Sequence, residues 1–423
     1  MSGRLAGRRA ATGALLIGGL ALAAAATAAD RDRLVFHAET GSGEVVASQL
    51  ADLTFNPASV VKVATSLWAL SMLGPDHRYS TAFAFTGDWD RAAGRITGDL
   101  VVIGGGDPDF HHENAFLVAR QLNQMGVLTV DGELVVVPPF WIGWENGADG
   151  PDREPGRREL DMAHRLLSAL DRGRWQAPQA RSWRALCARR GWEADPRPGV
   201  VIRGGLRVAE AAAGETLVVH RSNPLHSILR RFNVYSNNDV IRVADGLGGV
   251  EGLESFLRAR LGAGEELVDL STASGQQSNR LTARLVVKLI RESLADLECA
   301  GLRPEELLPV AGCDPGPLSD MFPALATGPQ GRTVVGKTGT LITTDGGVAV
   351  LSGTFRSRDR GPVIFCVAAP RSGYQAHRWR SVEERWLLEL MASTGGAEAR
   401  ICGPELPHPD TMAELVAMVA GPE

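Results

Sequence analysis

The chain has 423 residues, of which 44% are hydrophobic and 22% are charged, and its formal net charge is −5 at pH 7. This composition allows one large core or two moderate cores, and the nearly balanced charge argues against a nucleic-acid-binding protein. Only three of the 44 basic residues are lysines: Lys62, Lys288 and Lys337. Since arginine serves wherever a generic positive charge suffices, a retained lysine indicates a position that needs an amine able to lose its proton.

The first 29 residues have the pattern of a secretory signal peptide. Three arginines within the first nine residues precede a short apolar stretch at 14–26, and Ala26-Thr27-Ala28 supplies a small-residue cleavage site. The alternative is a transmembrane anchor, but the stretch is short and rich in alanine and glycine. We therefore expect an exported protein of the periplasm or cell envelope with no stable membrane anchor.

The next elements alternate between strand and helix patterns. A strand hairpin is expected at 33–51, and a helix at 58–73 is apolar on nearly all sides, so it should run through a core. Its only charge is Lys62. Further on, the sequence predicts short strands between 80 and 137 around a helix at 114–125, a surface loop at 145–161, and helical stretches over 160–190.

The second half of the chain is more regular. Helices are expected at 225–232, 237–246, 251–261 and 282–294, then antiparallel strands at 333–341, 347–356 and 362–369, and a final helix at 380–393. The chain has five cysteines, so they cannot all pair within it. Cys299 and Cys313 are the nearest pair in sequence, and Cys366 in an apolar strand is expected to be a core residue.

Ser59 and Lys62 lie three residues apart at the start of the apolar helix, which places both on one helical face. A serine hydroxyl becomes a good nucleophile when a neighbouring base accepts its proton, and a lysine among apolar residues is a plausible base because burial disfavours its ammonium form. The helix N-terminus also offers N–H groups to an oxyanion. Taken alone, an N-capping serine with a snorkelling lysine is the more common explanation.

Two further motifs extend the pattern. Lys337-Thr338-Gly339 lies in a predicted strand, where Gly339 leaves room for an extended peptide and Lys337 can face a substrate carboxylate. Ser236-Asn237-Asn238 precedes a helix, where the Ser236 hydroxyl could shuttle a proton and the Asn238 amide could bind the substrate or orient Lys62. Each of the three patterns occurs once, in the order found in β-lactamases and penicillin-binding proteins. Two of the three lysines fall in them, which favours one shared site.

With these motifs, the sequence resembles the class C low-molecular-mass penicillin-binding proteins, the D-alanyl-D-alanine carboxypeptidase/endopeptidase family. The resemblance covers nearly the whole chain after the signal peptide. It is carried by the segments 56–62, 98–100, 104–108, 223–225, 233–238, 279–282, 336–341 and 352–353.

The resemblance implies an α/β (α+β) transpeptidase/β-lactamase-like fold, with an antiparallel sheet flanked by helices. A domain at 81–214 would be inserted between the Ser-x-x-Lys and Ser-x-Asn motifs, and 30–80 and 215–423 would form the transpeptidase-like domain. The gap from Ser59 to Ser236 is much longer than the gap from Ser236 to Lys337, which supports an insertion.

The resemblance also implies roles for residues. Ser59 would be the nucleophile and Lys62 its base, and Ser236 and Asn238 would assist proton transfer and binding. Lys337 and Thr338 would hold the substrate carboxylate on a strand that includes Gly339, and the N–H groups of Ser59 and Thr340 would form the oxyanion hole. The substrates would be peptidoglycan muropeptides, with β-lactam antibiotics as acylating inhibitors and no metal or organic cofactor.

Two positions depart from the family pattern. Val234 stands where the family usually carries a lysine, and Thr272-Ala273-Ser274-Gly275-Gln276 replaces an Asp-Gly-Ser-Gly-Leu segment. These departures motivate one alternative, a catalytically weakened peptidoglycan-binding protein. A β-lactamase or esterase on the same fold is a second alternative, because it would differ in its deacylation rate, which the motif residues do not encode.

Overall fold

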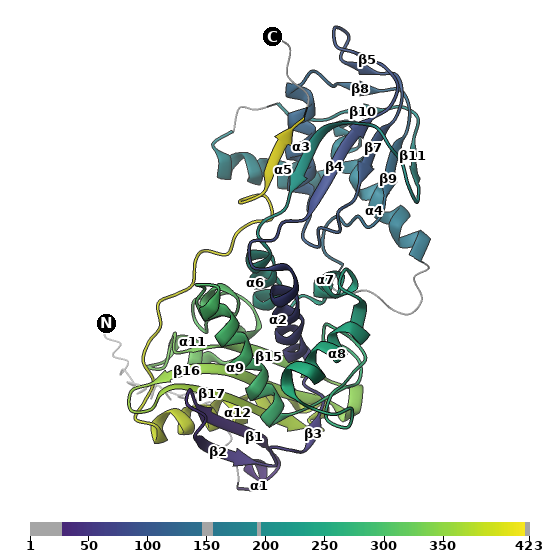
Figure 1. Cartoon of the computed structure of the whole chain (residues 1–423). Helices are drawn as coiled ribbons and strands as arrows, with labels where there is room; N and C mark the ends of the chain where they lie inside the picture. The colour runs from purple at the N-terminus through teal and green to yellow at the C-terminus, as the bar shows by residue number, and fades with distance from the viewer. Residues whose placement is uncertain (1–27, 146–154, 193–195, 419–423) are drawn as a thin grey trace, which may run out of the picture.

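The computed structural model describes residues 28–145, 155–192 and 196–418, and it forms two lobes joined by several segments of the chain (Figure 1). The expected signal peptide lies outside the described residues except for its last two positions, which begin the short helix α1 (Ala28–Arg31).

A five-stranded antiparallel sheet forms the centre of the first lobe, in the order β15-β16-β17-β1-β2. Its strands are β15 (Val334–Leu341), β16 (Val348–Ser357), β17 (Gly361–Pro370), β1 (Val35–Thr40) and β2 (Val45–Gln49). The three consecutive strands and the N-terminal hairpin agree with the sequence prediction. The order leaves β15 at an edge of the sheet.

Helices cover both faces of this sheet, because alternate residues of each strand point to opposite sides. Ile364, Cys366 and Ala368 of β17 join a core with helices that lie on one face, whereas Val363 and Phe365 join a second core on the other face. The first face carries α2 (Val61–Leu73), α6 (Leu225–Tyr235), α7 (Ile241–Asp245), α8 (Gly249–Leu261) and α9 (Ala283–Cys299). The second carries α10 (Pro317–Met321), α11 (Pro323–Thr327) and α12 (Ala376–Ser393). This arrangement confirms the predicted fold class.

Helix α2 runs through the core, as its uniformly apolar sequence predicts. Every residue from Val61 to Ala69 is buried, Lys62 included. A 3₁₀ turn (Ala58–Val60) leads into α2, and a small three-stranded sheet lies beside that turn: β13 (Asp269–Leu270), β14 (Asn279–Thr282) and β3 (Thr54–Phe55). The other 3₁₀ turns are Arg172–Arg174, Asn238–Val240, Pro304–Glu306, Thr344–Gly346 and Gly373–Gln375.

The second lobe has its own hydrophobic core. A six-stranded mixed sheet has the order β11-β9-β7-β4-β12-β18, and a four-stranded sheet has the order β10-β8-β6-β5. The strands are β4 (Ser80–Phe85), β5 (Trp89–Asp90), β6 (Arg95–Ile96), β7 (Leu100–Ile103), β8 (Thr129–Val130), β9 (Leu134–Val137), β10 (Val201–Ile202), β11 (Leu206–Val208), β12 (Glu215–Arg221) and β18 (Glu414–Ala417). The helices are α3 (His112–Gln124), α4 (Pro155–Leu170) and α5 (Ala177–Arg190).

The sequence predicts a domain boundary after residue 214, but the strand that follows this position pairs within the second lobe. Strand β12 pairs with β4 inside the second lobe, and β18 pairs with the other edge of β12. The sheet of the second lobe therefore includes residues up to Arg221, and a distant C-terminal segment adds a strand to it. Residues 215–221 form a strand. The sheet that this strand joins depends on long-range pairing, which local sequence does not encode.

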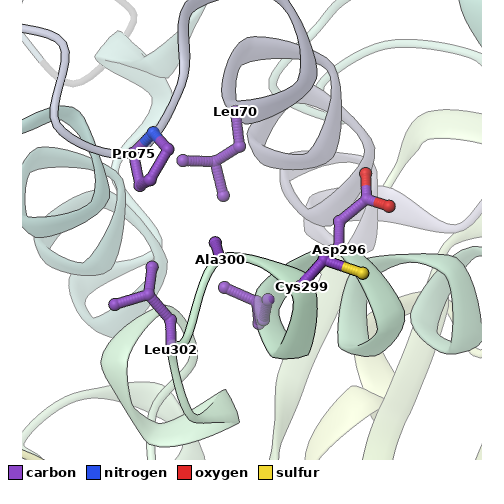
Figure 2. A pocket seen from close by; sticks show the side chains of 7 residues that line it. Leu70, Pro75, Asp296, Cys299, Ala300 and Leu302 are labelled. Carbon is purple, nitrogen blue, oxygen red and sulfur yellow. The ribbon is translucent and has the colours of Figure 1, made fainter.

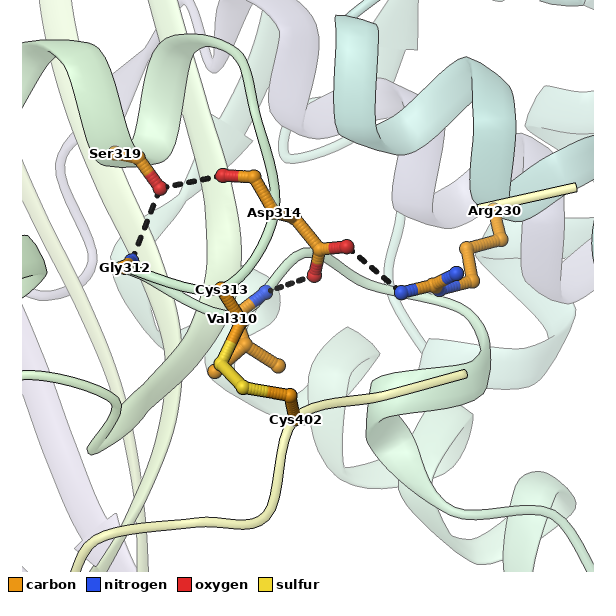
Figure 3. Close-up of a disulfide and its surroundings, with 7 residues drawn as sticks. All are labelled: Arg230, Val310, Gly312, Cys313, Asp314, Ser319 and Cys402. Atoms are coloured by element: carbon orange, nitrogen blue, oxygen red, sulfur yellow. Dashed lines mark hydrogen bonds and ion pairs between the residues drawn. A yellow bond between two sulfur atoms is a disulfide. The ribbon is translucent and has the colours of Figure 1, made fainter. Parts of the chain in front are cut away.

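Residues 403–413, which we name the C-terminal strap, run from the first lobe to the second (Figure 1). A disulfide between Cys313 and Cys402 fixes its start (Figure 3). Farther along, Arg231 donates to Pro407 O at 2.8 Å, and Asn114 donates to Pro409 O at 3.1 Å. The strap therefore contacts both lobes before it enters β18.

Of the five cysteines, Cys313 and Cys402 form a disulfide, and the other three are free. Cys299, the nearest cysteine to Cys313 in sequence, is free and exposed, and it lies on the rim of an apolar pocket between the ends of α2 and α9 (Figure 2). Cys366 is fully buried, as its apolar strand predicts. Within the described residues, no helix is long and apolar enough to cross a membrane.

Candidate active site

The backbone before Ser59 is held in an uncommon conformation. Ala58 has φ +48°, a left-handed value that costs energy for a residue with a Cβ. Asn56 holds this turn, because its Oδ1 accepts the Ala58 N–H at 3.0 Å and its Nδ2 donates to Gln277 O at 2.7 Å. Backbone strain that a side-chain contact holds in place points to a functional constraint at the next residue, Ser59.

Lys62 lies one helical turn after Ser59, as predicted, and its side chain is completely buried. Its Nζ lies 2.9 Å from Ser59 Oγ, 2.7 Å from Asn238 Oδ1 and 2.5 Å from Ser274 O. Asn238 and Ser274 can each accept one hydrogen from a neutral amine. The remaining lone pair of that amine is then available to the Ser59 hydroxyl.

Burial lowers the pKa of Lys62 well below its usual value, and the nearby Lys337 lowers it further. Both causes favour the neutral amine, the form that can accept a proton. Burial also lowers the pKa of Lys337, to about 7. Two of the three lysines therefore have pKa values far below that of an exposed lysine, which explains why arginine does not replace them.

The Ser236-Asn237-Asn238 motif begins where α6 ends. Ser236 has φ +53°, and Asn237 Oδ1 accepts the Asp239 N–H, which starts the next 3₁₀ turn. The second lobe contacts this turn directly, because Asp239 Oδ2 accepts the Glu145 N–H at 2.7 Å. The position of the motif therefore depends on both lobes.

Strand β15 brings the third motif to the same place. Lys337 Nζ lies 2.8 Å from Ser236 Oγ and 2.9 Å from Thr338 O. Gly339 lies against the turn that leads into Ser59, where a Cβ would meet Pro57 O at 2.7 Å and Ser59 N at 3.3 Å. A side chain at Gly339 would therefore push β15 away from Ser59.

The free edge of β15 faces outward beside Ser59. At the beginning of the strand, the Gly336 N–H points off the sheet and donates to Pro309 O. Because the direction of backbone N–H groups repeats every two residues, the N–H groups of Thr338 and Thr340 point to the same edge. Within the described residues, no backbone carbonyl accepts from those two N–H groups on that side. An extended peptide could pair there.

The sequence-predicted residues Ser59, Lys62, Ser236, Asn238 and Lys337 thus converge through direct contacts, with Thr338, Gly339 and Thr340 on the adjoining strand. Sequence reasoning missed the contribution of the Ser274 carbonyl. It treated 272–276 as a departure in side chains, but the contact with Lys62 uses the backbone. Gly275 permits this approach, since a Cβ there would lie 1.9 Å from Ala58 O.

The other departure, Val234, lies in the core. Its side chain is 1% exposed on α6. Two adjacent histidines, His111 and His112, lie at the start of α3, and His111 Nε2 lies 3.1 Å from Asp109 Oδ1. Among the described residues, no cluster of three or more His, Cys, Asp or Glu side chains could hold a metal ion.

The electrostatic coupling between the lysines makes a prediction about pH. If Lys62 is the base for Ser59, as the sequence predicts, acylation should slow as pH falls, because protonation of Lys62 removes that base. The charge of Lys337 lowers the pKa of Lys62. Lys337→Gln should therefore raise the pKa of Lys62 and move the acid limb of acylation to higher pH. Stopped-flow acylation by a chromogenic β-lactam between pH 4 and 9 measures both midpoints. An unchanged midpoint, or a shift to lower pH, would contradict the coupling.

Comparisons with known proteins agree with this arrangement. The model of the D-Ala-D-Ala carboxypeptidase 3 (S13) family matches residues 22–152 and 196–381. The carboxypeptidase DacB of Mycolicibacterium smegmatis is 29% identical over 395 residues, which cover 84% of this chain and 80% of that protein.

Solved structures show the same fold at low sequence identity. The predatory endopeptidase Bd3459 of Bdellovibrio bacteriovorus, acylated by penicillin G and in complex with an immunity protein, is 20% identical with a TM-score of 0.70 over 90% of this chain and 98% of that chain. Penicillin-binding protein 4 of Haemophilus influenzae is 18% identical with a TM-score of 0.61, over 84% and 96% of the two chains.

Proposed function

Because the chain belongs to the D-Ala-D-Ala carboxypeptidase 3 (S13) family, we propose that it cleaves peptidoglycan stem peptides through an acyl-enzyme on Ser59. It is a serine-type carboxypeptidase/endopeptidase, and the contacts of Ser59 support a specific course for its reaction. The observation that carries the proposal is the convergence of three separate motifs: Lys62 lies 2.9 Å from Ser59 Oγ and 2.7 Å from Asn238 Oδ1, and Lys337 lies 2.8 Å from Ser236 Oγ.

In the first step, Ser59 Oγ attacks the carbonyl carbon of the penultimate D-alanine. The hydroxyl proton passes to the neutral amine of Lys62, and the carbonyl oxygen becomes an oxyanion. The N–H of Ser59 and the outward N–H of Thr340 are the donors for that oxyanion. Both belong to rigid elements, so they need little reorganisation when charge develops.

The C–N bond then breaks, and the leaving amine must gain a proton. Ser236 Oγ is placed to deliver one, and Lys337 Nζ, 2.8 Å away, can resupply it. A pKa of about 7 lets Lys337 exchange a proton near neutral pH. Water subsequently attacks the Ser59 ester, which releases the shortened stem peptide and restores the hydroxyl.

β-Lactams should acylate the same hydroxyl, since their strained amide presents a carbonyl and a carboxylate to the cleft. The penicillin-acylated endopeptidase of the same fold supports this expectation. We also propose that the chain acts outside the cytoplasm. Its substrate is the cell wall, and the Cys313–Cys402 disulfide suits an oxidising compartment.

The test combines intact-protein mass spectrometry with product analysis. Wild-type protein incubated with penicillin should gain one penicillin mass, located by peptide mapping on the segment that contains Ser59. Incubated with a purified pentapeptide muropeptide and its cross-linked dimer, it should release D-alanine or separate the dimer. An adduct on another residue would refute the site, and a folded protein that neither binds penicillin nor cleaves either muropeptide would refute the function.

A further inference from the structure

Arg380 of helix α12 reaches the substrate-binding strand from the opposite face of the sheet. On β15, Lys337 and Gly339 point toward α2, so the alternation of side chains turns Thr338 and Thr340 toward the α12 face. Arg380 Nη2 donates to Thr340 Oγ1 at 2.9 Å. This contact joins the C-terminal helix to the strand that carries the Lys-Thr-Gly motif.

The positive charge of Arg380 has no counter-ion in the described part of the chain. Its Nε is buried without a hydrogen-bond partner, and its guanidinium forms no ion pair there. The nearest acid that influences it, Glu383, is fully buried, and both of its carboxyl oxygens lack a hydrogen-bond partner. Burial raises the pKa of Glu383 well above its usual value, which favours the neutral carboxyl, and no ion pair joins this side chain to Arg380 in the described part of the chain.

The contact with Arg380 uses the Thr340 hydroxyl as an acceptor. Its oxygen accepts a hydrogen bond from Arg380, so its own hydrogen is free to point elsewhere. Thr340 and Arg380 are both partly exposed, so a ligand at the β15 edge can reach them. A partly exposed hydroxyl that can still donate, next to a guanidinium with no ion pair in the described chain, is suited to bind an anion.

Lys337 supplies only part of the positive charge that would bind a carboxylate at this edge of β15. Its Nζ is engaged by Ser236 Oγ and Thr338 O, and its pKa of about 7 leaves it only partly charged at neutral pH. A guanidinium stays protonated throughout the working pH range. The residue that leaves on cleavage of a D-alanyl peptide bears a free carboxylate one carbon from the scissile nitrogen, and this carboxylate would lie along the same edge.

From this geometry we propose that Arg380, acting with and through Thr340, selects substrates and β-lactams that carry a carboxylate on the leaving side of the scissile bond. Arg380 is thus a positioning and specificity-determining residue that the motif set does not include. This inference rests on the proposed function, because it assigns the recognition of the leaving group to the site around Ser59.

The test uses two activated substrates that differ in one group. Both are acyl-D-alanyl thioesters, one with a thiol leaving group that bears a carboxylate and the other with the matching carboxamide. For Arg380→Gln, kcat/KM for the carboxylate substrate should fall about 10- to 100-fold, the loss expected for a hydrogen bond to a charged group. Most of the loss should appear in KM. The carboxamide substrate should change less than about twofold, because it carries no charge for Arg380 to recognise.

Three further variants separate recognition from structure. Arg380→Lys should recover part of the discrimination. Arg378→Gln removes a charge from the same helix, where Arg378 pairs with Asp30 instead, and should leave both substrates unchanged. Thr340→Val should reproduce the selective loss, and the double variant with Arg380→Gln should lose little more than either single variant, since the two side chains act as a unit.

The outcomes are distinct. Equal losses on both substrates, or no loss on either, would overturn the role of Arg380 while the wild-type activity on both thioesters upholds the proposed function. Failure of the wild type to hydrolyse either thioester would instead overturn the proposed function itself. Thermal unfolding of each variant shows whether a loss reflects destabilisation, in which case Arg380→Lys, which keeps the charge, decides between the two explanations.

Discussion

Replacing Ser59 with alanine is expected to abolish acylation and to lower kcat/KM for peptide hydrolysis by at least about 10⁴-fold, as loss of the nucleophile does in other serine hydrolases. Alanine keeps the turn into α2 and removes only the hydroxyl that lies 2.9 Å from Lys62 Nζ. The protein should therefore fold normally. Mass spectrometry after incubation with penicillin should show no adduct on the variant.

The same helix supplies a control for the loss of a hydroxyl. Ser71 lies at the far end of α2, where its Oγ donates to Leu67 O at 2.8 Å. Ser71→Ala should retain the penicillin adduct and hydrolyse peptides at a rate close to that of the wild type. If Ser59→Ala still formed a covalent adduct, the nucleophile would have to be sought elsewhere in the cleft.

Lys62→Arg should be nearly as damaging, although it conserves the positive charge. A guanidinium remains protonated, so it cannot accept the proton of Ser59. It is also too large for a site in which Nζ already lies within 3 Å of Ser59, Asn238 and Ser274. Loss of a general base lowers rates by roughly 10²- to 10⁴-fold, so we expect the second-order rate constant for penicillin acylation to fall by that amount.

Lys288 provides the matched control, since it is the one lysine outside the motifs. Lys288 lies exposed on α9, and its Nζ donates to Leu261 O at the end of α8 at 2.8 Å. Lys288→Arg should change the acylation rate constant by less than about threefold. Comparable losses in Lys62→Arg and Lys288→Arg would show that the rate does not depend on a neutral amine at position 62.

The sequence predicts those parts of the site in which the residues lie close together along the chain. Ser59 and Lys62 share a helical face because three residues make almost one turn, and Gly339 follows Lys337 on one strand face because strands alternate. The order of the three motifs, read as one set, then predicts their convergence. The same local logic identified the three hairpin strands of the first lobe and the buried helix α2.

What the sequence left open depends on contacts between distant segments. The Ser274 carbonyl reaches Lys62 through the backbone, so its side-chain pattern carries no signal of the contact. Cys402 pairs with Cys313 across a sequence separation of 89, where nearness in sequence favoured Cys299. Arg380 is one of many arginines, and only the packing of α12 on the sheet brings it to Thr340.

The C-terminal strap has a consequence for the order in which the protein matures. Strand β12 has a free edge until residues 414–417 have left the ribosome, and a free edge is a template for wrong pairing. Cys402 comes directly before the strap, so the covalent link to Cys313 also forms late. Final assembly of both lobes must therefore wait until the chain has been made as far as β18. Until then, the nascent chain needs protection from association with its neighbours.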